Sequence, residues 1–219
     1  DRDAPRSYLI TNAGLLDPAT GSVQANGHVL VIDGRIERVG TGALPARPDG
    51  VELINAGGRV LMPGLIDMHV HVFDETDLAA GLARGVTTVR NMGGFPFHLP
   101  LAARIERGEI LGPRLLTTGP ILNEVGGRNG NLLHEAVEGA DEARASVRRQ
   151  YAAGFRDLKL YSNLSRESFA AIREEAAGLG MTMSGHPVEG READPVDFAA
   201  SLEAGFQTLE HTESIVWHA

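Results

Sequence analysis

The stretch "GFRDLKLYSNLSRESFAAIREEAAGLGMTMSGH", residues 154–186, decides the fold expected for this chain. It begins with an apolar strand pattern at 155–161, continues into a helical pattern that starts at Ser165, and closes with a second strand pattern at 181–186. Ser165 is a typical helix N-cap, and a glycine near the end of the pattern would stop the helix. A strand, a helix and a second strand of these lengths predict a βα unit within a parallel sheet.

The same alternation continues on both sides of this stretch. One helical pattern opens with Asp141 as its N-cap and stops at Gly154, and another pairs Asp194 as N-cap with Pro195 at the first helical position. Together with the two strands above, about six βα units are present, with the other strand patterns at 60–72, 86–91, 114–118 and 206–211. The sequence therefore predicts an α/β fold, either a TIM-like (β/α)₈ barrel or an open doubly wound sheet.

The N-terminal residues lack this alternation and are typical of short strands joined by tight turns. In "HVLVIDGRIERVG", residues 28–40, two alternating apolar runs flank Asp33-Gly34, which predicts a hairpin because both turn residues tolerate positive φ. We therefore expect two domains: a small β-sandwich segment at 1–60 and a (β/α) barrel segment at 61–219.

Composition excludes several classes of protein. The 219-residue chain has a formal net charge of −9 and no block rich in lysine or arginine, which argues against a nucleic-acid partner. It has no cysteine, so any metal must be bound by histidine and carboxylate. No apolar run approaches 18 residues, so no membrane partner is expected. Small molecules or other proteins are the expected partners. We expect a cytoplasmic protein. Because the first residue is not Met, a periplasmic or secreted protein that has lost a signal peptide is the alternative.

Four histidines and the only lysine lie at the C-terminal ends of predicted strands. In "PGLIDMHVH", residues 63–71, His69 and His71 are two residues apart and would project from one face of a strand, about 7 Å apart. His186 and His211 each end a strand pattern, and Lys159 lies near the end of another. Each residue alone also fits a structural or surface role. Parallel strands meet at one rim with their C-terminal ends, so we expect the five side chains to converge there.

Three further residues are candidates for substrate contact. The connection "GPILNEVGGRNGNLLHEAV", residues 119–137, is long and rich in glycine, and such loops after a strand are often functional. His134 and Arg128 lie in it, and Tyr161 follows Lys159 at the two-residue spacing of one strand face. Solvent-exposed loop residues and a tyrosine that fills the barrel are the alternatives.

The motifs "PGLIDMHVH", "DLKLYSN", "SGHP" and "LEHTE", in this order, resemble the amidohydrolase superfamily, as do "GVTTVRNMGG" and "GPRLLTTGP". The branch they resemble most is the imidazolonepropionase-related and Xaa-Pro dipeptidase-like one. The resemblance implies a TIM-like barrel with one or two divalent metal ions at its rim, a small β-sandwich and a homo-oligomer. It implies that His69 and His71 bind the more buried ion, that a carboxylated Lys159 bridges two ions, and that His186 and His211 bind the second. Lys159, His186 and His211 would then also be catalytic.

The physical chemistry of a buried amine agrees with this role for Lys159. Burial disfavours the ammonium form, and a neutral amine can react with CO₂ to form a carbamate, whereas a guanidinium stays protonated. Two ions, most suitably Zn²⁺ with Mn²⁺, Co²⁺ or Fe²⁺ as alternatives, would lower the pKa of a shared water and polarise a carbonyl.

The expected reaction is hydrolysis of an amide-like C–N bond in a dipeptide or N-acyl amino acid by a metal-bound hydroxide. One alternative is a mononuclear hydrolase of a cyclic amide such as an imidazolone, with Lys159 in a structural role. The other is a non-catalytic remnant of such an enzyme.

The sequence departs from the superfamily pattern at its end. A complete barrel typically spans about 250 residues, and the last-strand aspartate that binds metal in the superfamily has no counterpart here. We expect strands seven and eight to lie outside this sequence. The 219-residue piece is therefore expected to be poorly soluble or inactive alone, because an incomplete sheet exposes its edges.

Overall fold

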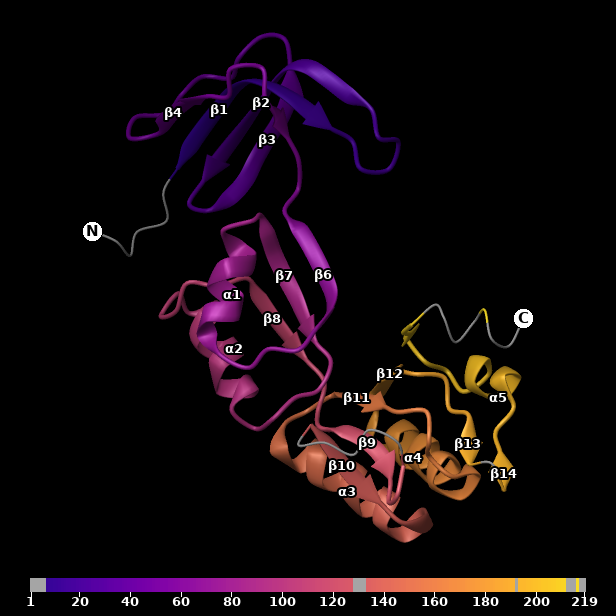
Figure 1. Ribbon diagram of the computed structural model, residues 1–219. Helices are drawn as coiled ribbons and strands as arrows, with labels where there is room; N and C mark the ends of the chain where they lie inside the picture. The colour runs from indigo at the N-terminus through magenta and orange to yellow at the C-terminus, as the bar shows by residue number, and fades with distance from the viewer. Residues whose placement is uncertain (1–6, 128–132, 192, 212–215, 217–219) are drawn as a thin grey trace. The chain divides into compact units, whose positions relative to one another are not determined.

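The computed structural model (Figure 1) describes residues 7–127, 133–191, 193–211 and 216. The chain divides into two units, Asp1–Gly64 and Leu65–Ala219. The division falls four residues after the sequence-based boundary at residue 60.

The N-terminal unit is a five-stranded sheet in the order β3-β2-β1-β4, with β5 also paired to β1. Strands β1, β2 and β3 are antiparallel, whereas β4 and β5 run parallel to β1. The predicted hairpin is confirmed: Asp33 and Gly34 have φ angles of 48° and 74°, the left-handed values that a tight two-residue turn requires. The strands are β1 (Tyr8–Leu16), β2 (Val23–Ile32), β3 (Arg35–Thr41), β4 (Glu52–Asn55) and β5 (Val60–Leu61).

The second unit alternates strands and helices and contains two parallel sheets, with strand orders β6-β7-β8 and β10-β9-β11-β12-β15. A separate antiparallel pair is formed by β13 and β14. Its strands are β6 (Leu65–Val70), β7 (Val86–Asn91), β8 (Arg114–Thr117), β9 (Ile121–Glu124), β10 (His134–Val137), β11 (Asp157–Leu160), β12 (Thr182–Gly185), β13 (Gly190–Arg191), β14 (Asp194–Pro195) and β15 (Thr208–Leu209). Its helices are α1 (Glu75–Leu82), α2 (His98–Glu106), α3 (Gly139–Ala153), α4 (Arg166–Leu179) and α5 (Phe198–Leu202).

The predicted βα unit at 154–186 is confirmed as β11, α4 and β12. Ser165 caps α4 by accepting a hydrogen bond from the backbone N–H of Ser168, and Gly180 ends the helix in the left-handed conformation. Strands β11 and β12 are parallel neighbours, and their register pairs Lys159 with Ser184. The α/β class with parallel sheets is therefore established for this unit.

Three local predictions are wrong. The segment 119–137 is not a continuous loop, because it contains β9 and β10. Helix α3 has Glu138 as its N-cap, and Asp141 lies in the first turn, where a carboxylate favours the helix dipole. Helix α5 begins after Asp197 rather than Asp194. The chain at 194–196 is still extended there, since the N–H of Val196 donates to the Glu189 carbonyl.

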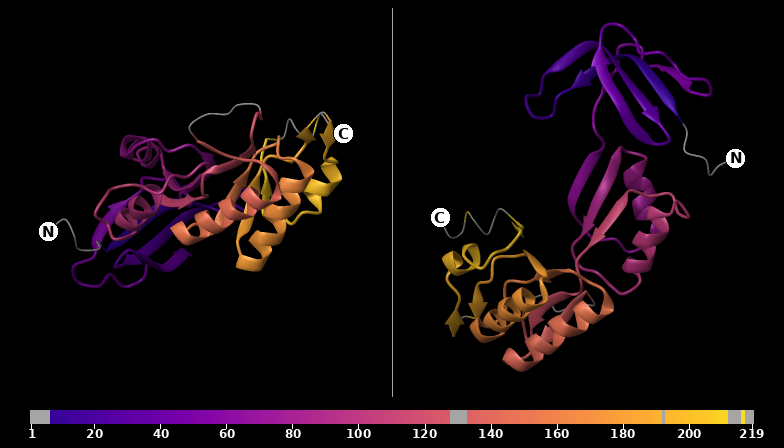
Figure 2. Two further views of the ribbon diagram at one scale, coloured as in Figure 1. Left: turned by 90° about the horizontal axis from the view of Figure 1, so that it is seen from below. Right: turned by 180° about the vertical axis from the view of Figure 1, so that it is seen from behind.

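The two parallel sheets are linked where β8 ends. The N–H of Thr118 donates to the Asn91 carbonyl at the end of β7, and the N–H of Gly119 donates to the Asp157 carbonyl at the start of β11. Helices α3 and α4 lie side by side (Figure 2), and the core beneath them includes Val147, Leu158 and Ile172. No helix in the described ranges is long and apolar enough to span a bilayer.

Candidate functional site

Lys159 lies in β11 with a side chain that is only 1% exposed. Among the described residues, its Nζ atom has no hydrogen-bond partner. Burial lowers the pKa of Lys159 to about 8; the carboxylates of Glu210 and Asp157 oppose this shift, and the charge of Arg90 adds to it. A substantial fraction of this amine is therefore neutral near physiological pH.

Asp157 lies two residues before Lys159 on the same strand but is engaged elsewhere. Its Oδ1 accepts a hydrogen bond of 2.9 Å from the Thr182 hydroxyl, and Ser184 donates at 3.5 Å. Burial raises the pKa of Asp157, while these hydrogen bonds and the charge of Arg90 partly offset the rise. The carboxyl group nearest to Lys159 in sequence thus does not bond to its amine.

The four histidines of the predicted site lie in one row. The ring centroid of His69, at the end of β6, is 5.5 Å from that of His71 and 4.9 Å from that of His211. The rings of His211 and His186 are 4.2 Å apart. His211 follows β15 with a φ of 66°, a left-handed value uncommon for a residue with a side chain. The structure thus brings these imidazoles together from three separate strands.

Within the part of the chain that the structure describes, no three His, Cys, Asp or Glu side chains are grouped closely enough to hold one metal ion. The metal-ligand roles of the four histidines and of Lys159 therefore stay predictions.

The backbone before His186 explains how this ring reaches the row. Gly185 has a φ of 145°, and a Cβ at this position would lie 2.3 Å from the Leu160 carbonyl oxygen. The absence of a side chain lets β12 approach β11, and the N–H of His186 donates to the same carbonyl at 3.0 Å. Burial, followed by the charge of Lys159, lowers the pKa of His186 to about 3, so the ring is neutral at physiological pH.

A charged pair that the sequence analysis missed borders the row. Glu210 places Oε2 2.8 Å from Nδ1 of His69 and Oε1 2.5 Å from Nη2 of Arg90. The side chains of Arg90 and Glu210 are only 7% and 11% exposed. Two signals were available: Glu210 immediately precedes His211, and Arg90 is the one charged residue in the strand pattern 86–91.

On the other side of the row lie two of the three candidate substrate contacts. The Tyr161 ring is 4.2 Å from His186 and 4.7 Å from His134. Burial, followed by the charges of Lys159 and His71, lowers the pKa of His134. Arg128 lies outside the described residues.

Asn123, which the sequence analysis also missed, determines the orientation of His134. Its Oδ1 accepts the N–H of Glu124 at 3.0 Å, which leaves Nδ2 to face Nδ1 of His134 at 3.1 Å. Since the amide NH₂ is a donor, Nδ1 of the neutral ring is the acceptor and Nε2 carries the proton.

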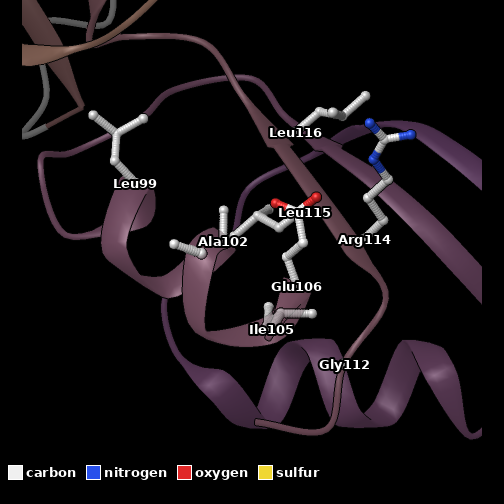
Figure 3. Close-up of a pocket in the computed structure, with 9 residues that line it drawn as sticks. Leu99, Ala102, Ile105, Glu106, Gly112, Arg114, Leu115 and Leu116 are labelled. Atoms are coloured by element: carbon white, nitrogen blue, oxygen red, sulfur yellow. The ribbon is translucent and has the colours of Figure 1, made fainter. Parts of the chain in front are cut away.

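A pocket of about 540 Å³ lies between α2 and β8, and none of the predicted site residues lines it (Figure 3). Its walls are mostly aliphatic, with Glu106 and Arg114 as the charged residues. It provides no group of catalytic side chains, so the row of rings remains the candidate site.

Comparison with known proteins relates this chain to enzymes of one superfamily. The chain is 41% identical to the dihydroorotase of Geobacter sp. (strain M21) over 95 residues, which cover 39% of this chain and 22% of that protein. It is 26% identical to the ochratoxinase of Aspergillus niger over 92% of this chain and 54% of that protein.

Two solved structures are similar over nearly the whole chain. A crystal structure from Bifidobacterium longum, provisionally named a prolidase, has a TM-score of 0.76 and 28% identity, and covers 95% of this chain and 55% of its own. The structure of a bottromycin amidohydrolase has a TM-score of 0.75 and 27% identity, and covers 96% of this chain and 44% of its own.

No family model matches the sequence. The chain spans about half of the length of the relatives that match it throughout, and less of the others. The relatives nevertheless agree with one another in kind, since they include amidohydrolases and related hydrolases. The chain belongs to the amidohydrolase superfamily.

Proposed function

We propose that this chain is part of a metal-dependent hydrolase that cleaves an amide-like C–N bond in a dipeptide or an N-acyl amino acid. The observation that carries the proposal is the buried amine of Lys159 without a hydrogen-bond partner beside a row of four imidazoles. The similarity to a structure provisionally named a prolidase and to an ochratoxinase supports the C–N bond as the target.

The chemistry of the residues present suits the binding of divalent metal ions. At this site two buried nitrogen atoms, Nζ of Lys159 and Nδ1 of His186, lack partners among the described atoms, and an orphaned buried nitrogen is costly unless something binds it. The set of imidazole nitrogens suits Zn²⁺ best, with Mn²⁺, Co²⁺ or Fe²⁺ as alternatives. His69, His71, His186 and His211 would hold two ions. Such ions supply Lewis-acid polarisation of a carbonyl and activation of a water molecule.

Lys159 would bridge the two ions as a carbamate. The neutral Nζ forms an N–C bond to the carbon of CO₂, one C=O electron pair moves onto oxygen, and the proton that nitrogen loses passes to solvent. The reaction needs no oxidant or reductant. It needs a neutral amine, which the low pKa of Lys159 provides.

The proposal includes a closed TIM-like barrel for the whole protein, completed by strands beyond those described. The parallel strands of both sheets support it, and so do the hydrogen bonds of Thr118 and Gly119 that link the two sheets.

Metal binding provides the first test. We expect elemental analysis of protein purified with zinc to find two ions per chain, and intact mass to increase by one CO₂. Chelation should abolish hydrolysis of an Xaa-Pro dipeptide, and zinc should restore it. His71→Ala should lower zinc occupancy, whereas His28→Gln, in the N-terminal unit, should not.

One ion per chain with an unmodified Lys159 would instead support the mononuclear cyclic-amide hydrolase. Zinc binding without hydrolysis of either substrate class, in the complete protein, would support a non-catalytic remnant.

His134 would donate from Nε2 to an oxygen of the substrate, with Tyr161 beside it. Asn123→Asp tests this role, because a carboxylate would draw the ring proton to Nδ1 and leave Nε2 as an acceptor. We expect kcat/KM to fall roughly tenfold, the equivalent of one lost hydrogen bond of about 1.4 kcal/mol.

Asn55→Asp, in the N-terminal unit, is the matched control and should leave kcat/KM unchanged. An Asn123→Asp variant with wild-type kcat/KM would exclude His134 as the donor.

A further inference from the structure

Glu210 joins three donors from different parts of the second unit. Its Oε2 lies 2.8 Å from Nδ1 of His69, and its Oε1 accepts hydrogen bonds from Arg90 at 2.5 Å and from the Thr208 hydroxyl at 2.6 Å. Its own backbone is held, since its N–H donates to the Gly185 carbonyl at 2.8 Å. The carboxylate therefore has little freedom to move.

This geometry determines the tautomer of His69. An ionised carboxylate only accepts hydrogen bonds, so the His69 nitrogen that faces it must carry the proton. The proton is then on Nδ1, and the lone pair of the neutral ring is on Nε2. A metal-binding histidine commonly has this arrangement, with its second nitrogen donating to a carboxylate.

Arg90 donates hydrogen bonds both to Glu210 and to the backbone next to His69. Its Nε donates to the carbonyl of Met68, the residue before His69, at 2.9 Å, while Nη2 of the same guanidinium binds Glu210. The planar guanidinium fixes the relative positions of these two acceptors. One side chain from β7 thus orients the His69 backbone and the carboxylate that orients the His69 ring.

We propose that Glu210, anchored by Arg90, is the positioning residue of His69: it fixes the Nδ1–H tautomer and turns Nε2 toward the neighbouring imidazoles. The part of this inference that concerns metal binding rests on the proposed function, whereas the tautomer does not.

The experiment compares wild type, Glu210→Gln and Glu210→Asp in the protein containing this chain, with Glu175→Gln as the matched control. Glu175 also pairs with an arginine, Arg148, and its side chain is 14% exposed, close to the 11% of Glu210. The first readout is the protonated nitrogen of His69 in the metal-free protein, from long-range ¹H–¹⁵N correlation spectra. The second is zinc affinity by competition with a chelator.

We expect wild-type His69 to carry its proton on Nδ1. Glu210→Gln should give a mixture of tautomers and bind zinc 10 to 100-fold more weakly, the usual effect of losing such a partner. Glu210→Asp should recover part of both properties, and Glu175→Gln should match wild type in both.

A wild-type His69 protonated on Nε2 would overturn the proposal without any variant, even if Glu210→Gln failed to fold. So would a Glu210→Gln variant with the wild-type tautomer and zinc affinity. If wild type shows the Nδ1–H tautomer but binds no zinc, the proposed function fails while the positioning of His69 stands.

Discussion

Replacing Lys159 with arginine is expected to reduce hydrolysis of an Xaa-Pro dipeptide about 1,000-fold. Arginine keeps the positive charge and similar length, but its guanidinium does not lose a proton and so cannot take up CO₂. Without the carbamate the two metal ions would lose their shared ligand. Metal ions contribute several kcal/mol of transition-state stabilisation, and each tenfold in rate corresponds to about 1.4 kcal/mol.

Three measurements check this prediction: kcat/KM, the number of zinc ions per chain, and intact mass for the CO₂ adduct. Lys159→Met should behave in the same way, which separates the loss of the carbamate from any strain that arginine introduces. The control is Arg156→Lys, which places a second lysine on an exposed position three residues away. This variant should take up no further CO₂ and keep its activity. A Lys159→Arg enzyme with more than one-tenth of wild-type kcat/KM would contradict the assignment.

The second large effect concerns stability. In the metal-free and CO₂-free protein, the pKa of Lys159 is about 8 in the folded state and 10.5 for an ordinary lysine. Between these values the unfolded chain holds a proton that the folded chain lacks, so the free energy of unfolding rises with pH. The rise amounts to about 3 kcal/mol from pH 8 to pH 10.5. Below pH 8 the penalty of the buried ammonium is fully present.

Lys159→Met should remove this rise, because the thioether has no charge to desolvate. Urea unfolding at a series of pH values measures it, as the difference between the wild-type and Lys159→Met curves, in which other titrating groups cancel. Arg156→Met, which removes an exposed cation from the neighbouring position, should follow wild type. Parallel curves for wild type and Lys159→Met across this range would show that Lys159 is not desolvated.

Sequence reasoning succeeded for the fold where the signals were local. The βα unit at 154–186 depends on Ser165 and Gly180, whose roles as caps follow from hydrogen bonds within one turn. Strands β9 and β10 were missed because each has only four residues and they flank a glycine-rich connection. Asn123 and Glu124 in β9 are polar yet buried, so no apolar alternation marked this strand.

Sequence reasoning likewise found only part of the candidate site. The spacing of His69 and His71 and the strand-end positions of the other histidines were enough to select the residues that the structure brings together. Glu210 and Arg90 could not be selected, because their contacts join residues 141 and 120 positions apart in the chain. No periodic pattern carries information over such separations.

The glycine before His186 limits how this protein can vary. Any side chain at position 185 would collide with the Leu160 carbonyl oxygen and push the two strands apart. His186 would then move away from the rings of Tyr161 and His211, although none of the three had been altered. At this peptide even an added methyl group is excluded. Mutational scanning should therefore find position 185 as intolerant of change as the histidine that follows it.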